Sequence, residues 1–161
     1  MFRTMTMLSR GVPAVIITLL FLLSAFLINT RPFGLVQLKD ITGGPGIPDM
    51  EIFYTPAALT GILDALGPAG REFYLTRIIP LDMIFPLLYS LFFLIVLFRL
   101  MDGLGLLNTR VAYLLILPVL AGSADYAENV CFLSILLNYP EPMSGIAALA
   151  SLFTLVKWFC T

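Results

Sequence analysis

The sequence predicts an all-α protein, a transmembrane four-helix bundle with a short amphipathic interfacial helix in its first extracytoplasmic loop. Of its 161 residues, 60 % are apolar and only 12 % are charged, and the mean hydropathy is +0.99. A soluble domain has about 25 % charged residues, so this chain has too few charges to cover a water-facing surface. The charges are also unevenly placed, because long stretches carry none, as segments that cross a bilayer require.

Four apolar runs define the predicted spans of a single membrane domain that covers residues 1–161. They lie at about residues 12–29, 78–100, 111–137 and 143–159. Basic residues precede the first run, as in a signal peptide, but the run lacks a small-residue cleavage site. We therefore interpret it as an uncleaved anchor. In the second run, Pro80 and Pro86 each remove a backbone donor, which a transmembrane helix tolerates when neighbouring groups compensate.

The segment 30–77 is the predicted first extracytoplasmic loop and the longest polar region of the chain. Within it, Thr55 and Pro56 have the pattern of a helix N-cap followed by proline in the first turn. Apolar residues then recur at helical spacing as far as Leu66, and Gly67 suits a helix end. We therefore expect a helix over residues 56–66 that lies on the membrane surface or covers the mouth of the bundle, followed by a second helix from near Pro68.

The distribution of basic residues predicts that both termini lie in the cytoplasm. Basic side chains precede the first span, flank the loop 101–110 and close the fourth span: Arg3, Arg10, Arg99, Arg110 and Lys157. Short cytoplasmic loops carry an excess of Lys and Arg, whereas the turn 138–142 has neither. Lys157 is expected to extend its charge to the membrane interface. The predicted location is the inner (plasma) membrane of a bacterium, with the lipid bilayer as a partner.

Polar residues inside the third span form the centre of a candidate ligand-binding site. Asp125, Glu128 and Asn129 are three and four residues apart, which places them on one helical face near the middle of the bilayer. A charge at that depth costs about 2.5–3.5 kcal/mol on insertion scales, so we expect these side chains to face the bundle interior or water. One acid should be protonated at neutral pH, unless a cation such as Arg71 or Arg77 reaches the pair.

Further residues near the second span complete this candidate site. Asp82 and Tyr89 share a helical face, and Tyr89 reaches about the depth of Glu128 if the helix ends are level. Arg71 and Tyr74 precede the same span. Together the seven residues predict an outward-opening pocket that binds a small polar ligand, an ion or a proton. The alternative is a structural or accessory subunit of a membrane complex, in which the same polar groups serve helix packing.

A membrane enzyme that acts on lipid, with Asp125 or Glu128 as the base, is the third hypothesis. The chain contains no histidine, which excludes His-ligated haem, most zinc and copper sites, and Ser-His or Cys-His catalysis. We therefore predict no catalytic residue, metal ligand or cofactor. The net charge of −1 and the lack of a basic tract also exclude nucleic acid as an expected partner. Because four helices are few for a carrier, transport would require a homo-oligomer or partner membrane subunits.

Several short motifs occur in one order along the chain. They are Tyr54-Thr55-Pro56, Ala65-Leu66-Gly67-x-x-Gly70-Arg71-x-x-Tyr74, Leu81-Asp82-x-x-Phe85-Pro86-x-x-Tyr89 and Ala124-Asp125-Tyr126-x-Glu128-Asn129. In combination, over roughly residues 40–160, the chain resembles a family of small uncharacterised bacterial integral membrane proteins with four helices. The resemblance implies the four-span topology and the polar residue set, and it implies no substrate.

Overall fold

The computed structural model describes residues 2–44, 47–141 and 143–161, and this part of the chain is helical and contains no β-strand. Three helical segments are long and apolar enough to cross a membrane: Val12–Asn29, Pro56–Gly103 and Arg110–Asn138. The fourth predicted span is a shorter apolar helix, α8 (Ser144–Cys160). The all-α class is confirmed, together with three apolar helices of membrane-spanning length.

Helix α2 (Val12–Asn29) coincides with the first predicted span and is preceded by a short helix that the sequence pattern did not predict, α1 (Phe2–Leu8). Gly11 joins the two helices with a φ of 64°, a conformation that L side chains rarely adopt. Only 6 % of the most apolar stretch of α2 is buried inside the protein. An apolar helix with so little protein contact is typical of a segment that crosses a membrane.

The predicted loop 30–77 is largely helical. It contains α3 (Leu35–Thr42), which the sequence pattern did not predict, a short 3₁₀ turn η1 (Pro48–Met50), and α4 (Pro56–Phe73). The predicted N-cap of α4 is confirmed, since the Thr55 side chain accepts a hydrogen bond from the Ala58 amide at 3.2 Å. The predicted stop is confirmed as well, because Gly67 has φ 64° and ψ 176° and divides α4 into two helical parts.

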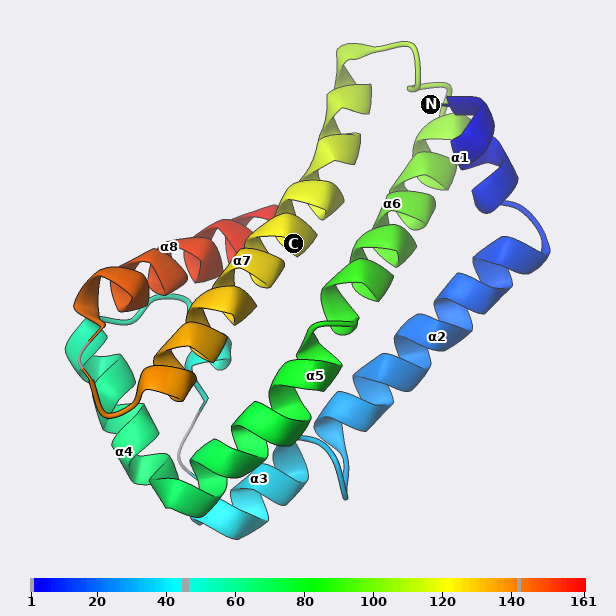
Figure 1. Cartoon of the computed structure of the whole chain (residues 1–161). Coiled ribbons are helices and arrows are strands. Elements are labelled where there is room, and N and C mark those ends of the chain that lie inside the picture. The colour runs from blue at the N-terminus through cyan, green and yellow to red at the C-terminus, as the bar shows by residue number, and fades with distance from the viewer. Residues whose placement is uncertain (1, 45–46, 142) are drawn as a thin grey trace.

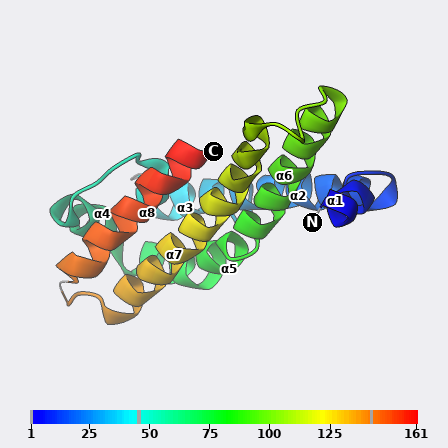
Figure 2. The ribbon, with the colours of Figure 1, turned by 90° about the horizontal axis from the view of Figure 1, so that it is seen from above.

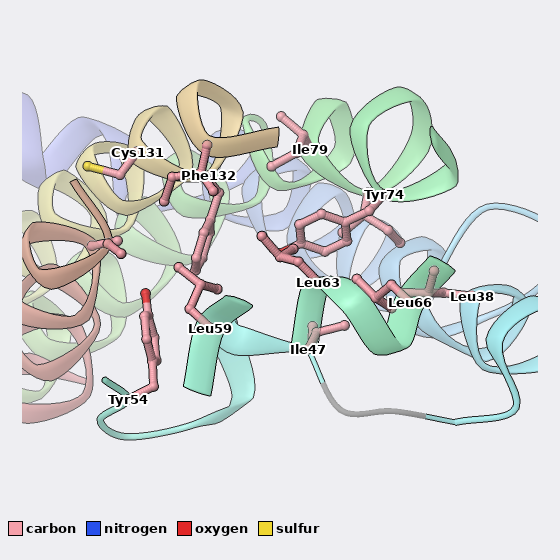
Figure 3. Close-up of a cluster of buried hydrophobic side chains, with 14 residues drawn as sticks. Leu38, Ile47, Tyr54, Leu59, Leu63, Leu66, Tyr74, Ile79, Cys131 and Phe132 are labelled. Atoms are coloured by element: carbon pink, nitrogen blue, oxygen red, sulfur yellow. The ribbon is translucent and has the colours of Figure 1, made fainter. Parts of the chain in front are cut away.

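Helix α4 packs over the end of the bundle that lies opposite α1 (Figure 1). Its apolar stripe turns inward, and Leu59, Leu63 and Leu66 are buried. Figure 3 shows these leucines in a cluster with Leu38 of α3 and with Phe132 of the third long helix. The amphipathic helix expected over residues 56–66 therefore covers the end of the bundle.

The second predicted span is divided at its prolines. A single π-helical turn η2 (Tyr74–Ile78) leads into α5 (Ile79–Asp82), and α6 (Phe85–Gly103) follows after a break. Before Pro80, the Ile79 amide bonds to the Tyr74 carbonyl five residues back, which is the π-helical pattern. Pro86 cannot donate to the carbonyl of Asp82 four residues back, and the helix is interrupted there.

The remaining long helices pack in the order α2, α6, α7 and α8, with neighbours in contact. A 3₁₀ segment, η3 (Arg110–Ile116), precedes α7 (Leu117–Asn138). The third predicted span therefore begins with a tighter helix. Figure 2 shows α8 alongside α7, which in turn lies beside α6. Helices α6 and α7 approach closely at Gly122, where an added Cβ would lie 2.0 Å from Ser90 Oγ. Small residues permit such close packing in membrane bundles.

Candidate functional site

A buried ion pair lies between α7 and α8. Lys157 Nζ is 2.7 Å from Glu128 Oε2 and 3.6 Å from Asp125 Oδ1. The exposed fractions are 7 % for Lys157, 3 % for Asp125 and 0 % for Glu128. The expectation that the two acids share a face turned into the bundle is therefore confirmed, and a cation does reach them.

The cation is Lys157, and the expectation that its charge reaches the membrane interface is wrong. Helix α8 has 17 residues and is therefore about 26 Å long, less than the roughly 30 Å of a hydrocarbon core. Its last residue Cys160 and the following Thr161 line a cavity together with Pro118, in the first turn of α7. The segment η3, which precedes α7 in the chain, extends past the end of α8 towards the loop that joins it to α6 (Figure 1). Lys157 consequently lies opposite the acids of α7.

The sequence contains a signal for this role of Lys157. Small and polar side chains form one buried stripe along α8: Ala147, Ala150, Ser151, Thr154 and Lys157. Their spacing of one and three residues is that of a single helical face. A lysine at the end of such a stripe faces the same neighbour as the rest of it, which here is α7.

Glu128 has a second partner on α8. The Thr154 hydroxyl donates a hydrogen bond to Glu128 Oε1 at 2.6 Å, and the Tyr54 hydroxyl lies 3.3 Å from Thr154 Oγ1. The backbone amide of Tyr54 donates to Ser151 Oγ at 3.0 Å. The segment before α4 is thus joined through polar contacts to α8, and through Thr154 to α7.

Asn129 compensates for the backbone donor that Pro86 lacks. Its side-chain Nδ2 donates a hydrogen bond to the backbone carbonyl of Asp82 at 2.8 Å. In a regular helix that carbonyl would accept from the amide of residue 86, which is a proline. Both Asn129 and Asp82 are buried, so the carbonyl has little access to water. The side chain on α7 therefore completes the hydrogen bonding of the break between α5 and α6.

A cavity of about 290 Å³ adjoins the ion pair, and its walls include Asp82, Asp125 and Lys157. Tyr89, a predicted site residue, is another part of its lining. A second cavity, of about 230 Å³, shares Tyr89 and Phe93 with the first. Buried charged groups therefore border a space that is large enough for a small molecule.

The structure brings five of the seven predicted site residues together, and Arg71 and Tyr74 lie apart from them. Tyr74 is part of the apolar cluster in Figure 3, where its ring meets that of Phe132 edge-on at 6.5 Å. The five that gather around the cavity and the break are Asp82, Tyr89, Asp125, Glu128 and Asn129. Ligand binding by any of these residues stays a prediction.

Arg71 belongs to a separate polar group at the α4 end of the molecule. Its Nη1 donates to the Leu63 carbonyl at 2.7 Å, which satisfies a backbone group near the break at Gly67. Its guanidinium carbon lies 4.0 Å from the centre of the Tyr139 ring. The Tyr139 hydroxyl donates to Asp64. That hydrogen bond raises the pKa of Tyr139, and the positive charge of Arg71 opposes the shift.

No protein-family model, curated protein or solved structure matches the chain. The resemblance to a family of small four-helix membrane proteins therefore stays a prediction, and the residues themselves must carry any statement about function. Within the described ranges, no group of three His, Cys, Asp or Glu side chains could hold a metal ion. The chemistry available at the site is that of carboxylates and an amine, which can exchange protons or bind charged groups.

Proposed function

We propose that the chain is a four-span integral membrane protein that binds a small polar ligand, an ion or a proton in an intramembrane carboxylate pocket. The observation that carries this proposal is the buried group of Asp125, Glu128 and Lys157 at the wall of a cavity. Ionisable residues inside membrane segments are costly, and they commonly mark paths or sites for ions and protons.

The charge balance of the pocket favours a cation or a proton as the ligand. Asp82, Asp125 and Glu128 are buried near a single lysine, Lys157. With all four groups ionised, negative charges exceed positive charges by two. Like charges confined to one buried site repel one another, so a bound cation or proton would stabilise this group.

The pocket can be tested through Trp158, which is the chain's only tryptophan and lines the cavity. In purified protein in dodecylmaltoside, we expect the emission of Trp158 to change with proton or cation concentration. The change should be largely lost in Asp125→Asn. It should persist in Asp102→Asn, the matched control, because Asp102 is an exposed acid at the far end of α6. An identical response in both variants, or no response in the wild type, would contradict the proposal.

A structural role of the same residues is the second candidate, and specific contacts favour it. Glu128 is engaged by Lys157 and Thr154, and Asn129 by the Asp82 carbonyl. Asp125 also lies 3.6 Å from Lys157 Nζ, and it lines the cavity together with Tyr89. We therefore propose that binding involves Asp125 and Tyr89, while Glu128 and Asn129 hold the helices that form the pocket.

The proposed orientation places α1 and the loop between α6 and α7 in the cytoplasm, with α8 returning towards that side. Arg10 and Arg99 support this orientation, since both lie at that end, where Arg99 Nη1 donates to the Ser9 carbonyl at 2.9 Å. We expect Asn108→Cys to react with an impermeant maleimide only after cells are permeabilised, and Glu141→Cys to react from outside. Both changes are made after Cys131 and Cys160 are replaced by serine, and this cysteine-free chain is the control. The reverse labelling pattern would overturn the orientation.

A further inference from the structure

Part of the wall of the cavity beside the ion pair comes from a connecting segment. Met50 lines this cavity together with Asp82 and Lys157. It is the last residue of η1 and belongs to the connection between α3 and α4, which the proposed orientation places on the extracytoplasmic side. The other lining residues belong to helices α2, α5, α6, α7 and α8, or directly follow α8. Connecting segments are commonly less stable than packed helices, so this wall is the one best suited to move.

Within residues 50–54 of this connection, burial is concentrated at one side chain. Met50 is 62 % exposed, and Ile52 and Phe53 are each 63 % exposed. Tyr54, by contrast, is only 4 % exposed. Residues 51–54 form neither helix nor strand, so no regular hydrogen-bonding pattern fixes them. The position of the segment 50–54 therefore depends mainly on the contacts of Tyr54.

Tyr54 reaches the polar group around Glu128. Its ring stacks on that of Phe132, with centroids 6.1 Å apart (Figure 3). Its hydroxyl lies 3.3 Å from Thr154 Oγ1, and Thr154 donates in turn to Glu128, the partner of Lys157. Because the Thr154 proton is directed to the carboxylate, the Tyr54 hydroxyl can donate to Thr154 Oγ1. A hydrogen bond between two neutral hydroxyls contributes little net stability, so this contact can open while the helices stay folded.

The position of the segment 50–54 indicates contact with water. Its contact with Thr154 places Tyr54 about 15 Å along the axis of α8 from the start of that helix. In a membrane-spanning bundle, backbone without helical hydrogen bonds persists at such a position only where protein covers it or where it borders water. The exposed side chains of Ile52 and Phe53 indicate that protein does not cover the outer surface of the segment. We therefore expect an aqueous path from the extracytoplasmic side to this wall of the cavity.

We infer that residues 50–54 form a lid on the cavity, that Tyr54 holds the lid closed, and that ions or small polar solutes reach the ion pair from the extracytoplasmic side when Tyr54 is released. This inference rests on the proposed function and adds the route by which its ligand enters. Lys157 can keep its contacts with both Asp125 and Glu128 while the lid opens, because the contact that opens is the one between Tyr54 and Thr154.

Quenching of Trp158 by succinimide tests the lid, because Trp158 lines the cavity and succinimide is a neutral solute that stays in water. Tyr54→Phe keeps the ring on Phe132 and removes the hydroxyl. In protein purified in dodecylmaltoside, we expect this variant to raise the quenching constant at least twofold. Tyr126→Phe is the matched control and should leave the constant unchanged, because Tyr126 lines a different cavity between α6 and α7. An equal rise in both variants would overturn the inference.

A nitroxide attached at Ile52→Cys in the cysteine-free chain follows the lid directly. Tyr54→Phe should increase the mobility of this label. A second label, attached at Leu137→Cys on an exposed part of α7, should keep its mobility in the same variant. An equal increase at both labels would mean that the whole fold has loosened, and it would overturn the inference.

Two changes of Thr154 keep the test decisive if Tyr54→Phe does not fold. Thr154→Val has nearly the shape of threonine but lacks the hydroxyl that Tyr54 contacts, so we expect the same rise in quenching of Trp158. Thr154→Ser keeps the hydroxyl and should behave as the wild type. An unchanged quenching constant in a folded Tyr54→Phe or Thr154→Val variant would overturn the inference.

The lid and the proposed function fail separately in these measurements. If quenching is unchanged in the variants while the emission of Trp158 still responds to protons or cations in an Asp125-dependent manner, the lid is wrong and the proposed function stands. If quenching rises in Tyr54→Phe but no Asp125-dependent response occurs, the lid stands and the proposed function is wrong.

Discussion

Lys157→Met is expected to lower the free energy of unfolding by about 3–5 kcal/mol, because it leaves buried carboxylates without their cation. Methionine has nearly the length of the lysine stem and is apolar, so the variant removes the charge with little loss of packing. Glu128 is fully buried and has the closest contact with the lysine, at 2.7 Å. Reversible unfolding in detergent, followed by circular dichroism, measures the loss.

The double variant Lys157→Met with Glu128→Gln separates charge from packing. Glutamine can still accept the hydrogen bond from Thr154, but it carries no charge. We therefore expect the double variant to be more stable than Lys157→Met alone. Lys39→Met is the matched control at an exposed position and should change stability by less than about 0.5 kcal/mol. A cost below about 1 kcal/mol for Lys157→Met would mean that the acids are neutralised in another way.

Local sequence signals were sufficient for much of the fold. The bounds of α2 follow from an apolar run, and the start and break of α4 follow from Thr55 and Gly67. The face shared by Asp125 and Glu128 follows from helical spacing alone. Each of these features depends on residues within one or two turns of each other, which is the range over which periodicity and capping act.

The parts that could not be predicted depend on how helices lie against each other. The pairing of Lys157 requires the depth of α8 relative to α7, which no pattern within either helix specifies. Arg71 was expected at the carboxylates, but the break at Gly67 directs it to the Leu63 carbonyl and the Tyr139 ring. Helix α3 has only eight residues, too few for a periodic pattern to be distinguished from a polar loop.

The break between α5 and α6 provides the second large expected effect, through Asn129→Leu. This change should cost about 1–3 kcal/mol, because the buried Asp82 carbonyl loses the donor that stands in for the missing amide of Pro86. Asn138→Leu is the matched control. It lies on the same helix, and its Nδ2 donates to the Ser134 carbonyl at 2.8 Å, but it is exposed. The control should change stability by less than about 0.5 kcal/mol.

Pro86→Ala tests the mechanism behind this cost. Alanine restores a backbone amide four residues after Asp82, so the carbonyl can accept a helical hydrogen bond without Asn129. We expect Asn129→Leu to cost at least about 0.5 kcal/mol less in the Pro86→Ala background than in the wild type. The two changes and their combination form a double-mutant cycle. Any other loss of stability at residue 129, including that from removing its buried Oδ1, occurs in both backgrounds and cancels when the two costs are compared. Equal costs in the two backgrounds would mean that Asn129 stabilises the protein by a route other than the carbonyl freed by Pro86. The same break sets the positions of Asp82 and Phe85, which both line the cavity. A smaller cost of Asn129→Leu in the Pro86→Ala background would therefore link the proline to the shape of the proposed pocket.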